Sequence, residues 1–177
     1  MTLNISENKL PNCAGICAMP RLLELDLTGN RLTSLTDLKG LGSLKKLIVK
    51  GNKLTDLEAF PVLPELESFN AEENLIAENG EKALANLRDC SALNTIIMTG
   101  NGWVDDKGED FKKEVLIALD NLRIKQVNDM EEVTAEEIDE AKKEKDERER
   151  ARLEAEEEAR KAAEEAANNP EAEENNE

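Results

Sequence analysis

Five asparagines recur along the first 101 residues at almost constant intervals, and this spacing constrains the fold more than any other feature of the chain. Successive asparagines lie 22, 22, 22 and 27 residues apart, and apolar residues stand five and three positions before each one. The five are Asn8, Asn30, Asn52, Asn74 and Asn101. A fixed period of this length is typical of proteins built from stacked structural repeats. We therefore expect a solenoid whose function lies on its surfaces.

The repeats superpose at every apolar position when they are aligned on their asparagines. Around Asn30 the pattern is Leu22, Leu25, Leu27, Leu32, Leu35, Leu38 and Leu41, and the repeat around Asn52 keeps apolar residues at the same offsets. Alternation before the asparagine predicts a short strand with one buried face, and the wider spacing after it predicts a return along the convex side. This pattern is that of a leucine-rich repeat. The predicted fold class is an α/β leucine-rich-repeat solenoid with a short parallel sheet on its concave face, a C-terminal helical cap and a long charged C-terminal helix.

The asparagines are interpreted as a structural ladder. A side-chain amide both donates and accepts hydrogen bonds, so a buried asparagine can satisfy backbone groups at a bend where no strand partner exists. Replacing one of these asparagines should lower the free energy of unfolding, because a buried polar group left without a hydrogen-bond partner costs roughly 1–3 kcal/mol.

We divide the chain into four parts. Residues 1–102 are predicted to form about five repeats, with a short outer helix at residues 81–88 in the enlarged fourth repeat. Residues 103–130 form a cap, in which Trp103 is a core residue and an amphipathic helix carries Phe111, Val115, Leu116, Leu119 and Leu122. Residues 131–167 form the long charged helix, and residues 168–177 are a disordered acidic tail. The first repeat leaves an open edge strand, so either a partner covers that end or the sequence is truncated there.

Residues six, four and two positions before each ladder asparagine should point out of the sheet onto the concave surface, and we take them as the candidate partner-binding residues. Beyond the first repeat they are Glu24, Asp26, Thr28, Lys46, Ile48, Lys50, Ser68, Asn70, Glu72, Thr95, Ile97 and Thr99. Lys46 and Lys50 flank Ile48 at the centre, where they could anchor carboxylates of a partner. The alternative interpretation is that these side chains only face solvent, because the surface lacks the large aromatic residues that usually contribute most of the binding energy at an interface.

Composition excludes several classes of function. Residues 1–130 carry 20 acidic and 15 basic side chains, and residues 131–177 carry 20 and 8, so the net charge of −17 argues against nucleic-acid binding. There is no apolar run long enough for a membrane span, and an odd number of cysteines favours a cytoplasmic protein with reduced thiols. Without histidine, and with Cys13 and Cys90 at core positions, catalysis is not expected. Residues 105–110 lack the spacing of a calcium loop, and no metal, cofactor or small-molecule substrate is predicted.

The long helix begins at a capping box, Thr134 to Glu137, and consists mainly of Ala, Glu, Lys and Arg. Its apolar residues do not keep a heptad over three or four repeats, so the pattern favours a single charged helix. Pairs such as Glu144 with Arg148 and Glu156 with Arg160 should stabilise it. Whether it is an arm docked in an assembly or a free solubilising tail stays open.

Within the leucine-rich-repeat class, four segments resemble the radial-spoke leucine-rich-repeat protein of motile cilia. They are residues 65–70, 81–89, 111–117 and 131–150, and the resemblance extends over roughly residues 25 to 150. Phe111-Lys112 stands where that family tends to have Tyr-Arg, and residues 122–127 replace its usual Leu-x-x-Leu-Asp. The resemblance implies a non-enzymatic structural subunit of the ciliary or flagellar axoneme, located in the cytoskeleton, with other radial-spoke or axonemal subunits as partners.

Two alternative functions belong to other members of the repeat class. One is a regulatory binding protein of a protein phosphatase. The other is an acidic nuclear leucine-rich-repeat protein that binds histones, although the lysines and arginines of residues 131–177 favour a helix over a polyanionic coil.

Overall fold

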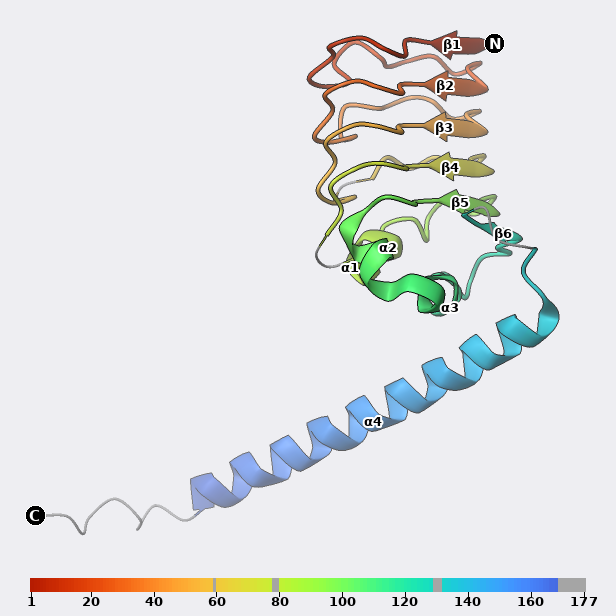
Figure 1. The fold of residues 1–177 in the computed structure, drawn as a ribbon. Helices are drawn as coiled ribbons and strands as arrows, with labels where there is room; N and C mark the ends of the chain where they lie inside the picture. The colour runs from red at the N-terminus through yellow and green to blue at the C-terminus, as the bar shows by residue number, and fades with distance from the viewer. Residues whose placement is uncertain (59, 78–79, 129–131, 169–177) are drawn as a thin grey trace, which may run out of the picture.

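The computed structural model describes residues 1–58, 60–77, 80–128 and 132–168, and for residues 80, 81 and 165–168 the backbone alone. Six parallel strands follow one another in chain order across one sheet (Figure 1). They are β1 (Thr2–Asn4), β2 (Glu24–Asp26), β3 (Lys46–Ile48), β4 (Ser68–Asn70), β5 (Thr95–Ile97) and β6 (Gln126–Val127). This arrangement confirms the predicted solenoid with a short parallel sheet.

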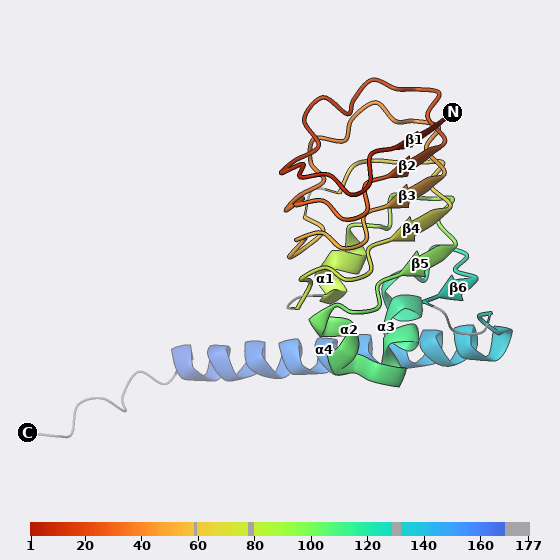
Figure 2. The same cartoon turned by 45° about the horizontal axis from the view of Figure 1, so that its top comes forward.

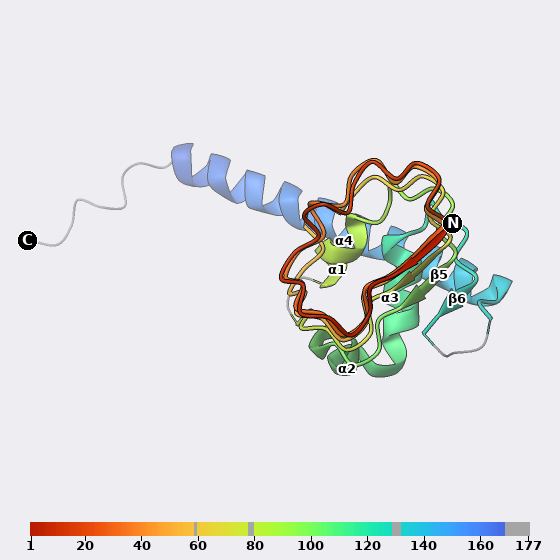
Figure 3. The same ribbon diagram turned by 90° about the horizontal axis from the view of Figure 1, so that it is seen from above.

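Each turn of the solenoid buries the same apolar positions against the turns above and below it. The central residues Leu25, Leu47, Phe69, Ile96 and Val127 pair in register and are at most 1% exposed. Seen along the solenoid axis, the chain traces of successive turns nearly superimpose around this interior (Figure 3). The core is therefore a continuous column of aliphatic side chains, as the repeat pattern predicts.

Four asparagines join successive repeats in the same way. The Nδ2 atoms of Asn30, Asn52 and Asn74 each donate to the carbonyl oxygen three residues earlier and to the equivalent carbonyl of the preceding repeat, at 2.9–3.0 Å. Their Oδ1 atoms accept from the backbone N–H of Leu10, Leu32 and Leu54 at 3.0–3.1 Å. Asn101 repeats this arrangement and is fully buried. Backbone groups at the bend, which no strand pairs, are satisfied by these amides.

Asn8 differs from the other ladder residues because its side chain is exposed. Its Nδ2 donates to the carbonyls of Ile5 and Ser6, both at 2.9 Å, but β1 is the edge of the described sheet and nothing there offers a partner for the remaining contacts. The expectation of a buried amide is therefore wrong at this position. Leu3 and Ile5 of the same repeat are only partly buried.

The residue before each ladder asparagine has a positive φ, which turns the chain sharply at the bend. The φ values are 66° at Gly29, 66° at Gly51 and 72° at Gly100. Glu7 and Glu73 adopt the same conformation, with φ of 55° and 52°. Glycine favours this left-handed region because it has no Cβ.

Short helices close the C-terminal end of the solenoid. They are α1 (Gly80–Ala85), α2 (Gly102–Lys107), the single 3-10 turn η1 (Gly108–Asp110) and α3 (Phe111–Ala118). The predicted outer helix is present as α1, although it ends at Ala85. Trp103 is buried, and its ring meets that of Phe111 edge to face at 5.4 Å. The predicted cap helix stops at Ala118, before Leu119 and Leu122, so the chain can turn back and add β6, which the sequence pattern did not predict.

The long helix is α4 (Ala135–Asn168), and it runs beneath the cap and beyond it (Figure 2). The predicted capping box is formed, because Thr134 Oγ1 accepts from the Glu137 backbone N–H at 3.2 Å and Glu137 Oε2 accepts from the Thr134 backbone N–H at 2.8 Å. The expectation of disorder at residues 169–177 lies outside the described residues.

Candidate protein-binding surfaces

The twelve candidate residues lie on one side of the sheet and alternate with buried residues of the same strands. In β2, for example, Leu25 is buried whereas Glu24 is exposed and Asp26 is half-buried. All twelve are exposed or half-buried. The structure thus brings together the side chains of β2 to β5 that alternation assigned to the concave surface.

Local hydrogen bonds already occupy several polar atoms of this surface. Asp26 Oδ1 accepts from the backbone N–H and the hydroxyl of Thr28, at 2.9 and 2.6 Å. Asn70 Oδ1 accepts from the Glu72 backbone N–H at 3.0 Å, and its Nδ2 donates to Glu72 Oε2 at 2.6 Å. Such short bonds from a side chain to the backbone two residues on are typical of Asx motifs. These local hydrogen bonds fix the side chains of the surface, and a partner would have to bond to polar atoms that already have a partner within the chain.

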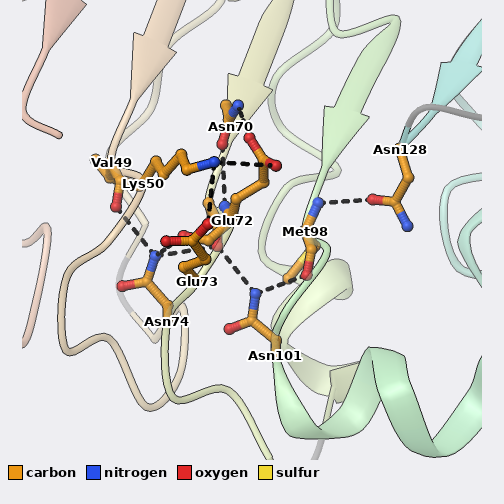
Figure 4. A network of polar contacts seen from close by, with 10 residues as sticks. Val49, Lys50, Asn70, Glu72, Glu73, Asn74, Met98, Asn101 and Asn128 are labelled. Carbon is orange, nitrogen blue, oxygen red and sulfur yellow. Dashed lines mark hydrogen bonds and ion pairs between the residues drawn. The ribbon is translucent and has the colours of Figure 1, made fainter. Parts of the chain in front are cut away.

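Lys50 is held by acidic residues of the next repeat (Figure 4). Its Nζ lies 3.5 Å from Glu72 Oε1 and 3.1 Å from Glu73 Oε1. The hydrogen bond with Glu73 and the charge of Glu72 raise the pKa of Lys50. Its charge is therefore largely matched within the chain. Lys46 is exposed and makes no ion pair with any residue that the structure describes, so it is the more available cation of the predicted pair.

Asn128 is a polar residue of the sheet end that the sequence analysis did not single out. It is 5% exposed, and its Oδ1 accepts from the backbone N–H of Met98 at 2.7 Å (Figure 4). It follows β6 directly, whereas the ladder asparagines follow their strands by several residues. Because Asn128 does not stand at the position of a ladder asparagine, the repeat pattern does not predict its hydrogen bond to Met98, and only the structure shows it.

A second candidate surface is α4, whose first four turns pack on α3. Four ion pairs join the cap to this part of α4: Lys112 with Glu137, Lys113 with Glu144, Asp120 with Lys145, and Glu114 with Arg148, at 2.6–3.0 Å. Ala141, 1% exposed, lies in the contact. From residue 149 to residue 164 every side chain of α4 is exposed. The helix is thus docked over its first part and projects over its second.

Glu114 is the buried centre of the α3–α4 contact. Both of its carboxylate oxygens accept from the Arg148 guanidinium at 3.0 Å, and Oε1 also accepts from Lys107 Nζ at 3.2 Å. The hydrogen bond from Arg148 lowers the pKa of Glu114, whereas burial opposes this shift. On α4 itself, hydrogen bonds from Lys113 and then Arg148 lower the pKa of Glu144. These carboxylates are therefore ionised at neutral pH, as fixed parts of the docked surface.

The buried cysteines fit the core positions that the sequence analysis gave them. Burial raises the pKa of Cys13 to about 11 and also raises that of Cys90, which keeps both thiols protonated. Among the described residues, no cluster of metal-ligating side chains is found. No helix within the described ranges has the length and apolar character to span a membrane.

Comparison with solved structures identifies the fold. No known protein-family profile and no curated protein matches this sequence. Among solved structures, the chain resembles the U2A′ chain of the Drosophila melanogaster SNF/U2A′ complex, with a TM-score of 0.63 and 19% sequence identity over 80% of this chain and 79% of that one. The fold is a leucine-rich-repeat solenoid.

Proposed function

We propose that this leucine-rich-repeat protein is a non-catalytic binding subunit of a larger protein assembly. The concave surface of β2 to β5 carries this proposal, because it presents four neighbouring rows of polar side chains with Ile48 and Ile97 half-buried among them. Partly exposed aliphatic groups within a polar rim are suited to contact with another protein. The similar U2A′ chain was solved in complex with a second protein, which supports the same kind of role here.

We further propose that the assembly is the radial spoke of the ciliary axoneme. Support comes from the resemblance of residues 65–70, 81–89, 111–117 and 131–150 to the radial-spoke leucine-rich-repeat protein. Of these segments, the first includes β4, the second overlaps α1, the third lies in α3 and the last includes the docked part of α4. On this proposal the protein is located in the cytoskeleton of cilia or flagella, and its partners are other spoke subunits.

The experiment is to express a fluorescently tagged copy in a ciliated cell and to isolate axonemes. We expect the tag along the axoneme and its retention after detergent extraction. Diffuse cytoplasmic signal that detergent removes would contradict the axonemal assignment. Nuclear signal, together with histone capture that depends on residues 131–177, would instead favour the acidic nuclear alternative.

The concave surface is tested separately with Lys46→Glu. Lys46 has no ion-pair partner in the described part of the chain, so its reversal should leave the thermal melting temperature nearly unchanged and lower incorporation into axonemes several-fold. Lys39→Glu, an exposed lysine outside the concave rows, is the matched control. Lys50→Glu is unsuitable, because it would place a third carboxylate beside Glu72 and Glu73. Equal incorporation of both variants would move the binding surface elsewhere.

A further inference from the structure

A row of exposed side chains follows the asparagine ladder on the far side of the bend from the concave surface. Lys9, Arg31 and Lys53 each come directly after a ladder asparagine, and Leu75 holds the same position in the fourth repeat. Backbone hydrogen bonds align them, because the N–H groups of Arg31, Lys53 and Leu75 donate to Leu10, Leu32 and Leu54, at 2.9 Å in each case. Each of these acceptors is the neighbour of the preceding member of the row.

The three cations Lys9, Arg31 and Lys53, hereafter the basic row, follow one another along the solenoid. Lys9, Arg31 and Lys53 are exposed, and none makes an ion pair within the described ranges. Repeats stacked through parallel strands stand about 4.8 Å apart, so the three charges follow one another closely. Like charges at such separations repel. A strip of this kind in a chain of net charge −17 is suited to bind a partner's carboxylates.

Leu75 ends the basic row and begins a groove against α1. It is 56% exposed, although the three equivalent residues before it are charged. The groove has a volume of about 360 Å³, and Leu75, Ala77, Ala83 and Leu57 form its apolar wall. At one side, Lys82 Nζ and Glu58 Oε1 form an ion pair of 2.8 Å. An exposed aliphatic side chain beside a groove of this size can bind an apolar side chain of a partner.

Asn86 supplies an unpaired donor in the same groove. Its Nδ2 atom is buried and has no hydrogen-bond partner among the residues described, and the side chain lines the groove. Buried polar atoms nearly always have a partner, since leaving one unpaired is costly. Because this atom is shielded from solvent, it is not among the groups that a bound segment would contact.

We propose that the basic row and the α1 groove form one docking site for an acidic segment of a partner protein. Carboxylates of the segment lie over Lys9, Arg31 and Lys53, and an aliphatic side chain packs on Leu75. Asp56 and Glu58 line the groove together with Lys82, and the net negative charge of these three side chains favours the apolar end of the segment there. A nucleic-acid strand fits less well, because its phosphates would meet the acidic chain without using the apolar wall. This site is independent of the concave surface.

The test uses a fluorescein-labelled peptide of two leucines, one glycine and six glutamates, with binding to the full chain followed by fluorescence anisotropy at low and physiological salt. The variant Lys9→Glu/Arg31→Glu/Lys53→Glu should bind about tenfold more weakly, as expected when three exposed ion pairs are lost. The control Arg21→Glu/Lys39→Glu/Arg123→Glu changes the net charge equally at exposed positions elsewhere, and it should lose less than about threefold.

The apolar half of the site is tested with the same peptide in which both leucines are replaced by serine. Wild type should prefer the leucine peptide by about fivefold, the effect expected for one aliphatic side chain in a shallow groove. Leu75→Lys, which restores the charge pattern of the other repeats, should abolish that preference while glutamate binding persists. The proposal is overturned if neither peptide binds at low salt, if both triple variants lose affinity equally, or if a hexauridylate oligonucleotide binds wild type more tightly than the leucine peptide.

Discussion

At the scale of single residues, buried side-chain amides link successive repeats. Asn52 makes four hydrogen bonds, of which two reach the backbone of the preceding repeat at Leu27 and Leu32. Asn8 has the same sequence environment but only the two bonds within its own repeat. Identical motif positions can therefore differ widely in their contribution to stability.

Replacing Asn52 with leucine should destabilise the solenoid strongly, because the side chain keeps a similar size while the backbone groups at the bend lose their partners. We expect a loss of about 2–4 kcal/mol in the free energy of unfolding, measured by urea denaturation. Asn8→Leu is the matched control and should cost less than about 1 kcal/mol, since Asn8 is exposed. Equal losses would mean that local bonds within one repeat, not the links between repeats, determine stability.

At the scale of elements, the cap and the long helix are joined by opposite charges around a small apolar contact. Glu114 of α3 lies with its side chain 5% exposed, whereas the Arg148 side chain of α4 is 43% exposed. The predicted pair of Glu144 with Arg148 is present at 2.6 Å, whereas Glu156 pairs with Arg152 at 3.6 Å and not with the predicted Arg160. Arg148 thus stabilises α4 internally and also fixes it to α3.

Arg148→Ala should loosen the docked part of α4 and lower the free energy of unfolding by about 1–2 kcal/mol, since Lys107 still contacts Glu114 and Arg148 is partly exposed. The folded-state pKa of Glu114 lies below its ordinary value, so this contribution is present above about pH 4.3 and is lost as the pH falls through the lowered pKa. Wild type should therefore lose more stability than the variant between pH 5 and pH 3.

Urea denaturation at several pH values measures this difference, and hydrogen exchange reports the loosening of residues 135–148 directly. Arg150→Ala, two residues further along α4 and exposed, is the control and should behave like wild type. Parallel pH dependences for wild type and Arg148→Ala would show that the Glu114 contact does not set the acid sensitivity of the docked helix.

At the scale of the whole molecule, the protein consists of a compact solenoid and a projecting arm. The strands stack along one axis, and α4 crosses beneath the cap and continues past the outline of the solenoid (Figures 2 and 3). Its 34 residues correspond to roughly 50 Å of helix. The first part of this helix packs on the cap of the same chain and its second part projects, so docking of the projecting part in an assembly stays a prediction.

Two truncations should separate the docked part from the arm. A chain ending at Arg150 keeps every ion pair between α4 and the cap, so we expect its melting temperature to stay within about 1 °C of wild type. A chain ending at Val133 also exposes Leu116 and Leu119 and leaves Glu114 without Arg148, and should melt at least about 5 °C lower. Calorimetry measures both. A large shift from the shorter deletion would show that the arm contributes to the stability of the solenoid.

The sequence by itself determined the repeats, the register of the strands and the buried face of each, because the period of 22 residues and the alternation before each asparagine leave few other arrangements. It also placed the twelve concave residues, which follow from alternation alone, and the capping box that begins α4. The tertiary structure alone decided that β6 joins the sheet and that Arg148 anchors α4 on Glu114. These features depend on contacts that do not recur with the period of 22 residues, so no periodic signal in the sequence predicts them. The basic row depends on both. The repeat period predicts the spacing of its three cations, but the row lies next to the α1 groove only because the fourth repeat packs against the third.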